Sequence, residues 1–310
     1  MKLAPVVMFV YNRADHFAQT YEALSRCKEA TETDLYVFSD GARSEKDIEK
    51  VNNVRAAVRE VEETTVFRTM EVIESPVNKG LAASVIAGVT KILEKYGRVI
   101  VVEDDCLTSS YFLSFMNKSL EFYERNQRIG AIAGYTPELS LPGNYKEDVF
   151  LAYRSCSCAW ATWADRWQNI DWELEKVKDF YRNSELIKKL NCNGSDRFIR
   201  LYRQTKGNGS SWSVRFGAHL VRNNQLTVYP RYSYVQNIGC DESGVHSKME
   251  DAIKMKVDLS KAIENPRLKD VEVNEEVQKV MKRHYSSGLK SDIKRAVATS
   301  MIVAKERLKG

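Results

Sequence analysis

The segment Arg98-Val-Ile-Val-Val-Glu-Asp-Asp-Cys106 carries the strongest structural signal in this chain. Its four consecutive apolar residues, Val99–Val102, are typical of a strand that is buried on both faces of a parallel sheet. Three carboxylates follow at once: Glu103, Asp104 and Asp105. In open α/β folds, ligands bind in the crevice outside the carboxyl ends of the strands. The segment therefore predicts negative charge at the edge of the sheet where a ligand would bind.

The three neighbouring carboxylates allow two interpretations. Adjacent acids repel one another unless a cation or a positively charged side chain lies close to them. Mg2+ and Mn2+ prefer oxygen ligands and often bridge protein carboxylates to the phosphates of a substrate, so the cluster fits a metal–phosphate site. The alternative is a loop whose acids face water or cap the next helix, because helix N-termini favour acids without any function. This segment alone leaves both interpretations open.

The first half of the chain alternates between apolar runs and segments with helical spacing. This alternation predicts a mostly parallel sheet with helices on both faces. The expected strands are Val6–Val10, Leu35–Phe38, Met70–Ile73 and Val99–Val102, and the expected helices are Asp15–Arg26, Ile48–Val61, Lys79–Tyr96 and Tyr111–Tyr123.

Composition and charge argue against several classes of protein. Of the 310 residues, 43% are hydrophobic and 29% are charged, as in ordinary soluble globular proteins. Residues 279–310 hold nine lysines and arginines against two acids, whereas the whole chain carries a net charge of +5. The remaining residues are close to neutral, which argues against a groove for nucleic acid. The six cysteines include no CxxC pair, so we expect reduced thiols and a cytoplasmic protein.

Polar residues follow each expected strand and would meet in one crevice. Arg13 and Lys79 can face phosphates, and Asp40 can accept hydrogen bonds from a base or a ribose. Because Gly80 has no side chain, a ligand could come close to the backbone at the N-terminus of the next helix. Helix N-termini favour anions. No GxGxxG follows the first strand and no GxxxxGK[ST] occurs, so other common phosphate-binding loops do not fit. The segments after the first three strands are Tyr11-Asn12-Arg13, Ser39-Asp40-Gly41 and Asn78-Lys79-Gly80.

These strand-end motifs together resemble those of the nucleotide-sugar glycosyltransferases with the GT-A fold. The motifs are Val-Tyr-Asn-Arg13, Ser-Asp-Gly41, Asn-Lys-Gly-Leu81 and Val-Val-Glu-Asp-Asp105. More narrowly, the chain is similar to bacterial family 2-like sugar transferases and to eukaryotic N-acetylglucosaminyltransferases with a Glu-Asp-Asp form of the DxD motif. The resemblance covers about residues 1–250.

The resemblance implies a fold, a donor and a metal. The fold would be a GT-A, Rossmann-like, mixed and mostly parallel sheet flanked by helices, with a C-terminal helical extension. The donor would be a nucleoside diphosphate-sugar, commonly linked to UDP, and Mn2+ or Mg2+ would be held chiefly by Asp105. We expect a nucleotide-binding half at residues 1–108, an acceptor half at 109–250 and a basic helical extension at 251–310. The expected donor-binding residues are Tyr11, Asn12, Arg13, Asp40, Asn78, Lys79, Gly80, Glu103, Asp104 and His246.

His246 closes the strongest motif of the second half, which runs from Tyr229 to Ser-Gly-Val-His246. The motif resembles a family segment that returns to the pyrophosphate. His246 is expected to ligate the metal or to donate a hydrogen bond to a phosphate oxygen, although a lone histidine is more often structural.

Tryptophans crowd the segment from Ser155 to Trp167. Trp160, Trp163 and Trp167 recur at intervals of three and four, which predicts that they share one face of a helix. They either pack in the core or form a wall on which a sugar stacks, and the resemblance supports a tryptophan-rich segment beneath the donor sugar. Trp212 is a further candidate for sugar contact.

An inverting transferase needs a carboxylate that removes the proton of the acceptor hydroxyl. Asp196 resembles the acid-then-Arg pattern that opens a helix in family 2 transferases, and Asp165 is the alternative. Either acid could instead cap a helix or form a surface ion pair. Related sequences often carry an acid just before Trp212, but Ser210 and Ser211 stand there, so the motif does not assign the base.

The tail repeats apolar residues at intervals of three and four, which predicts an amphipathic helix from Leu289 to Leu308 surrounded by lysines and arginines. This helix would either lie on an anionic membrane at the inner face of the cell, or dock onto the domain or a second subunit. The membrane interpretation suits a lipid-linked saccharide acceptor in the synthesis of capsule, O-antigen or lipopolysaccharide.

Two other functions compete with a hexosyl- or N-acetylhexosaminyltransferase that moves a sugar from UDP to a saccharide. A sugar nucleotidyltransferase should show a Gly-rich loop after the first strand, where Tyr11–His16 stands instead. A non-catalytic glycan-binding protein would need the tryptophans but not Asp40, Lys79 and the three acids.

Overall fold

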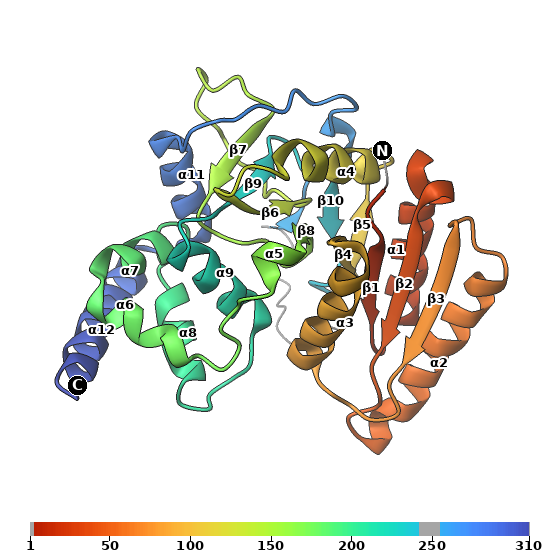
Figure 1. The fold of residues 1–310 in the computed structure, drawn as a ribbon, viewed down its shortest axis with the longest axis horizontal. Helices are drawn as coiled ribbons and strands as arrows, with labels where there is room; N and C mark the ends of the chain where they lie inside the picture. Colours follow the sequence, from red (N-terminus) through yellow and green to blue (C-terminus); the bar gives the residue numbers. More distant parts are fainter. Residues whose placement is uncertain (1–2, 242–254, 310) are drawn as a thin grey trace.

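The computed structural model describes residues 3–241 and 255–309, which form an eight-stranded mixed sheet flanked by helices (Figure 1). The strand order is β3-β2-β1-β4-β8-β6-β9-β7. β1 pairs in parallel with both β2 and β4, and β2 pairs in parallel with β3. This parallel half confirms the predicted sheet. Its strands are β1 (Val6–Val10), β2 (Asp34–Ser39), β3 (Thr69–Glu74) and β4 (Arg98–Glu103).

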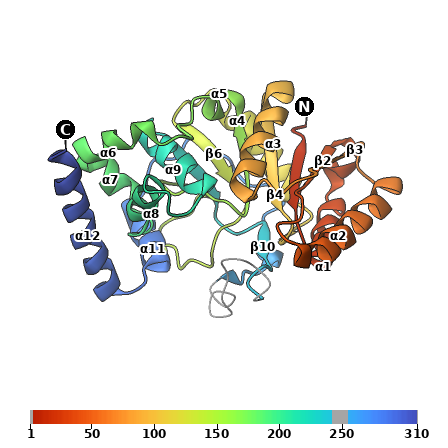
Figure 2. The same ribbon diagram turned by 90° about the horizontal axis from the view of Figure 1, so that it is seen from below.

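Helices cover both faces of the parallel half, as the alternation predicts. α1 (Ala14–Ser25) and α2 (Glu45–Glu63) lie on one face, and α3 (Leu81–Tyr96) lies on the other (Figure 2). Gly88 lets α3 approach the sheet closely, since a Cβ there would lie 2.9 Å from the ring of Phe9. The chain leaves β1 towards β2 and returns through α3 to β4 on the other side. The point between β1 and β4 is therefore the place where ligands bind in such folds.

The second half of the chain completes the sheet with antiparallel pairings that the sequence does not predict. β8 pairs antiparallel with both β4 and β6, so Val102 lies opposite Ala159 and Arg98 opposite Trp163. A small second sheet joins β5 to β10. The bounds are β5 (Cys106–Thr108), β6 (Ile129–Ala133), β7 (Val149–Ala152), β8 (Ala159–Trp163), β9 (Leu226–Pro230) and β10 (Val235–Asn237).

The helix predicted for the tryptophan-rich segment is wrong. Trp160 and Trp163 belong to β8, and only Ala164–Trp167 forms a helix, α5. Side chains three residues apart on a strand point to opposite faces, so Trp160 and Trp163 cannot share a surface. The segment forms a strand despite its helical spacing, because it pairs with two neighbouring strands and is buried along its whole length.

A helical layer packs beside the sheet and contains a second apolar core, formed by residues that include Phe180, Phe198 and Val214. The described part of the tail, residues 255–309, packs onto the body, since Val277 and Met281 are fully buried in the main core. In the described ranges, no helix is long and apolar enough to cross a bilayer. The remaining helices are α4 (Phe112–Tyr123), α6 (Lys178–Arg182), α7 (Ser184–Leu190), α8 (Arg197–Gln204), α9 (Trp212–Arg222), α11 (Glu275–Tyr285) and α12 (Leu289–Arg307), with 3-10 turns η1 (Lys28–Glu32), η2 (Glu175–Val177) and η3 (Leu259–Lys261).

Candidate functional site

The acid cluster lies where the sequence predicts it, beyond the carboxyl end of β4 and next to the end of β1. Arg13, which follows β1, contacts Asp104 through its guanidinium and lies 3.0 Å from Oδ2 of Asp105. Although burial opposes its charge, the two carboxylates raise the pKa of Arg13. The guanidinium predicted to face phosphates thus neutralises the acids instead, because opposite charges at the switch point attract each other.

Burial disfavours the negative charges of Glu103 and Asp104 unless a positive charge lies close to them. Burial raises the pKa of Asp104 to about 6, against the attraction of Arg13 and together with repulsion from Asp105. The pKa of Glu103 also lies well above its usual range, because burial and both neighbouring aspartates disfavour its charge. A carboxyl group with a raised pKa gains from any cation that approaches it. One arginine relieves only part of the repulsion.

The donor set fits a hard divalent cation that is shared with a substrate. Mg2+ is commonly held by one or two carboxylates and completes its shell with substrate phosphates and water, rather than by a cage of protein ligands. Asp104 and Asp105 offer two such carboxylates. Across residues 3–241 and 255–309, no group of three or more His, Cys, Asp or Glu side chains is arranged to hold a metal alone. His246, the other predicted ligand, lies outside the described residues.

The segment after β10 closes over Asp105. Pairing between β5 and β10 places Asn237 opposite Cys106, and the Asn237 side chain donates to Oδ1 of Asp105 at 2.9 Å. The backbone N–H of Ile238 donates to the Asp105 carbonyl at 2.8 Å. Gly239 is required here, because a Cβ at this position would lie 2.0 Å from Oδ2 of Asp105. The absence of a side chain at Gly239 thus lets the chain approach the acid cluster closely.

Asp40 organises the loop before α3 rather than standing open to a ligand. Its carboxylate accepts hydrogen bonds from the backbone N–H groups of Gly41, Lys79 and Gly80 at 2.9–3.1 Å, and from the Asn78 side chain at 3.3 Å. The N–H groups predicted to face a phosphate therefore bind Asp40, which supplies the anion itself. The Lys79 side chain remains exposed. Asp40 therefore holds the loop before α3 in place.

Replacing Asp40 by Ala is expected to lower the free energy of unfolding by about 3 kcal/mol, since the backbone N–H groups of Gly41, Lys79 and Gly80 would lose a charged acceptor. Urea denaturation of the variant measures the loss. The matched control is Glu49→Ala, which removes an exposed carboxylate from α2. Equal stability of the two variants would contradict the role of Asp40.

Tyr11 and Asn12 are partly buried beside the cluster. The Tyr11 hydroxyl accepts from the backbone N–H of Arg43 at 3.0 Å, which ties the end of β1 to the loop after β2. These contacts keep the predicted donor-binding residues of three strand ends together at one edge of the sheet.

α1 adds two residues that the sequence reasoning missed. The Thr20 hydroxyl donates to the Asp104 carbonyl at 2.7 Å and accepts from the N–H of Cys106 at 3.1 Å. Nε2 of His16 lies 3.2 Å from Oδ2 of Asp241. His16 and Thr20 stand four residues apart on one face of the helix that follows β1, a spacing that could have indicated both.

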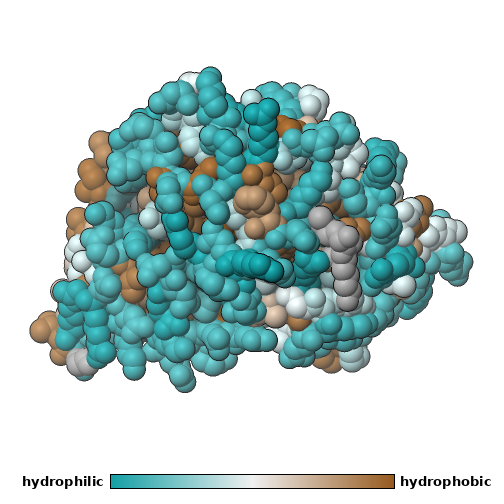
Figure 3. Space-filling view, turned by 45° about the horizontal axis from the view of Figure 1, so that its top comes forward, coloured by the Kyte–Doolittle hydropathy of each residue, from teal (hydrophilic) through white to brown (hydrophobic). Residues whose placement is uncertain are grey.

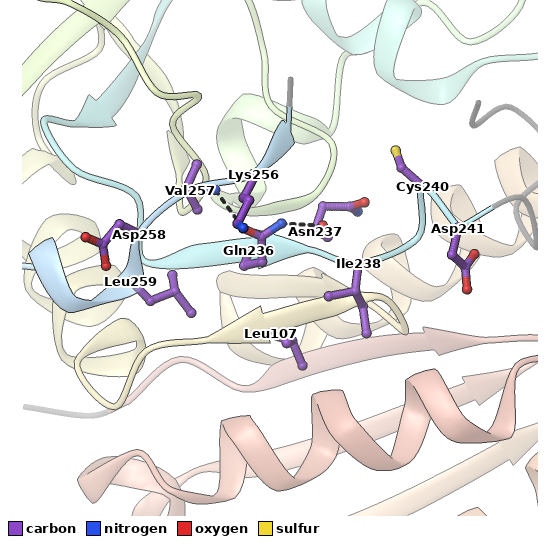
Figure 4. A pocket seen from close by; sticks show the side chains of 10 residues that line it. All are labelled: Leu107, Gln236, Asn237, Ile238, Cys240, Asp241, Lys256, Val257, Asp258 and Leu259. Atoms are coloured by element: carbon purple, nitrogen blue, oxygen red, sulfur yellow. Dashed lines mark hydrogen bonds between the residues drawn. The ribbon is translucent and has the colours of Figure 1, made fainter. Parts of the chain in front are cut away.

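A cavity of about 550 Å3 opens beside the cluster (Figure 4). Its lining includes Asn237, Asp241, Lys256 and Asp258. The acid cluster and this cavity share Asn237, whose amide group binds Asp105. A ligand in the cavity would therefore lie next to the acids.

The tryptophans form a buried cluster, which favours core packing over a sugar-stacking wall. The Trp160 and Trp212 rings stack with centroids 4.9 Å apart, and their exposed fractions are 0% and 3%. Trp163 lies on the opposite face of the sheet, where its indole N–H donates to the Leu120 carbonyl at 3.2 Å. Trp167 completes the stack on Trp160. Their rings are covered by neighbouring side chains in this structure.

Asp165, the alternative base that the sequence offers, lies at the other end of the sheet strands from the acid cluster. Because Arg98 lies opposite Trp163, Asp165 lies beyond the amino end of β4. Asp105 lies beyond the carboxyl end, and a strand of this length spans roughly 20 Å. Asp165 instead accepts hydrogen bonds from Arg166 and from Gln127.

Asp196 begins α8, as predicted, and lies among arginines. Its Oδ2 is 3.7 Å from Nη1 of Arg200, and its side chain is 28% exposed. Arg197 beside it is buried, and burial together with the charges of Arg154 and Arg200 lowers its pKa to about 9. The Asp196 carboxylate therefore lies at the start of α8, close to the guanidinium groups of Arg197 and Arg200.

Comparisons with known proteins give distant structural matches. Neither a protein-family model nor a curated protein sequence matches the chain. Solved structures of glycosyltransferases, in contrast, do match the chain. TarS from S. aureus matches with a TM-score of 0.43 and 13% identity, over 76% of this chain and 36% of TarS. The mannosyltransferase PcManGT from Pyrobaculum calidifontis, in complex with GDP-Man and Mn2+, matches with a TM-score of 0.43 and 11% identity, over 70% of this chain and 68% of its own.

An active-site mutant of LgtC matches with a TM-score of 0.38 and 10% identity, over 70% of each chain. Identities this low concern the fold alone, and the superpositions are loose. The reaction and its substrates are therefore inferred from the residues of the site.

Proposed function

We propose that this protein is a metal-dependent, inverting glycosyltransferase that moves a hexosyl or N-acetylhexosaminyl group from a UDP-sugar to a saccharide. The observation that carries the proposal is the pair of buried carboxylates, Asp104 and Asp105, at the switch point between β1 and β4. A ligand that brings both a cation and negatively charged phosphates would satisfy the acids and the nearby basic side chains together.

Different residues would hold the metal, supply positive charge for the phosphates and position the loop at the donor. Asp105, with Asp104 beside it, would hold Mn2+ or Mg2+, and the bound ion would neutralise the charge that develops on the diphosphate leaving group. Arg13 and the exposed Lys79 supply positive charge beyond the ends of β1 and β3, on either side of β2. Asp40 positions the loop that carries Lys79. Asp196 is the proposed base that takes the proton of the acceptor hydroxyl.

The proposal also covers the acceptor and the location of the enzyme in the cell. We propose a saccharide acceptor that is lipid-linked and used in the synthesis of a surface polysaccharide, with the enzyme at the inner face of the cell membrane. The strongly basic tail supports this proposal, because anionic lipid attracts it.

Calorimetry with UDP and hydrolysis assays with UDP-, GDP- and dTDP-sugars test the proposed function. We expect UDP to bind in the presence of Mn2+ and to bind much more weakly without it, and we expect slow release of the sugar from one UDP-sugar. Release of pyrophosphate from a nucleoside triphosphate and a sugar phosphate would instead indicate a nucleotidyltransferase. Glycan binding without nucleotide binding would indicate a non-catalytic protein.

A further inference from the structure

The last helix, α12, has one face packed on the body and one face open to solvent. Thr299 is buried, and Ile302 and Val303 pack against the second apolar core beside α6 and α8. Figure 2 shows α12 along one end of the molecule, with its opposite side facing outwards. The helix is therefore docked on the body, and its other face stays open to solvent.

The open face of α12 carries an apolar stripe. Leu289, Ile293, Val297 and Met301 recur every fourth residue with exposed fractions of 77%, 55%, 55% and 68%. Leu308 continues the stripe at 89%. Apolar side chains also colour the left edge of the molecule in Figure 3, the side on which Figure 1 places α12. Exposed apolar residues that form one continuous stripe mark a contact surface, whereas scattered ones do not.

The charges of α12 are sorted between its two faces. Its two acids turn towards the body: Asp292 accepts from Ser195 and Ser286, and Glu306 accepts from Tyr202. The exposed residues of α12, all of which are described, include no carboxylate. They do include the three lysines Lys290, Lys294 and Lys305, whereas the guanidinium of the exposed Arg307 donates to the Tyr181 carbonyl of the body.

We propose that the open face of α12 binds flat on the surface of an anionic lipid bilayer. A stripe of long apolar side chains flanked by lysines and arginines is the pattern of helices that lie in the membrane interface. Anionic headgroups would supply the counter-charge that the exposed face lacks. A second copy of this chain fits less well, because a symmetric contact would bring the same three lysines together. The inference goes beyond sugar transfer and does not depend on it.

Flotation of the full chain with vesicles tests this inference. We expect binding to vesicles of phosphatidylcholine with about one-third phosphatidylglycerol, little binding to pure phosphatidylcholine, and loss of binding at roughly 1 M salt. The variant Ile293→Gln, Val297→Gln, Met301→Gln removes the stripe, and Lys290→Glu, Lys294→Glu reverses the flanking charge. Each should weaken partitioning about tenfold or more.

The matched control is Lys46→Glu, Lys50→Glu on α2, where two exposed lysines flank the exposed Ile48. It changes net charge equally and should leave partitioning unchanged. Thermal unfolding and UDP binding of each variant show whether the fold and the donor site survive. Unchanged partitioning of the glutamine variant would overturn the inference. So would equal binding to neutral vesicles, or a self-association in solution that the glutamine variant abolishes while vesicles bind nothing.

Discussion

Replacing Asp105 by Ala is expected to abolish the Mn2+ dependence of UDP binding and to lower sugar transfer by about 100- to 1000-fold. A metal that polarises a phosphate leaving group contributes several kcal/mol to the transition state, and each 1.4 kcal/mol is a factor of ten. Asp105 is the acid that the segment after β10 encloses, through Asn237 and the close approach of Gly239. The fold should tolerate the change, because removing one of three neighbouring acids relieves their repulsion.

The matched control for this variant is Asp165→Ala. Both residues are aspartates that contact an arginine and follow a sheet strand, but they lie at opposite edges of the sheet. Calorimetry with UDP, with and without Mn2+, should separate them: only the Asp105 variant should lose the effect of the metal. If the Asp105 variant binds UDP and Mn2+ like the unaltered protein, the metal assignment fails, whatever the activity.

The parallel half of the fold could be predicted because its signals are local. The strand predicted at Val6–Val10 matches β1, and the predicted helices differ from α1 to α4 by a few residues at their ends. Apolar runs and helical spacing follow from the burial of each element alone. β8 could not be predicted, because Ala-Trp-Ala-Thr-Trp163 becomes a strand through its pairing with β4, about 60 residues earlier, and with β6.

The candidate site, too, could be predicted only in part. The sequence places Arg13, Asp40 and Asp105 correctly at strand ends, because parallel strands bring their carboxyl ends to one edge. It does not reveal their partners. Asp40 binds backbone N–H groups, and Arg13 binds the acids, since both arrangements depend on how loops from separate strands meet. Asn237 reaches Asp105 only through the pairing of β10 with β5, although the two residues are 132 positions apart in the sequence.

Replacing Asp196 by Asn is expected to lower turnover by about 100- to 10,000-fold while UDP binding stays unchanged. A positioned general base contributes a factor of this size, and the amide keeps the shape of the side chain but cannot accept the proton. Asp165→Asn should leave turnover unchanged, because Asp165 lies at the other edge of the sheet. Single-turnover rates with saturating donor measure the chemical step apart from binding.

A purely structural role of Asp196 predicts a different result. The buried Arg197 has Asp196 as a nearby negative charge, so a structural Asp196 would lower stability when replaced, and its loss would change turnover and unfolding together. A catalytic Asp196 lowers turnover and leaves urea unfolding nearly unchanged. Full turnover would move the base elsewhere, and Asp241 is then the acid to replace. It lines the cavity beside the cluster, and His16 lies 3.2 Å from its carboxylate, where it can hold that group in place.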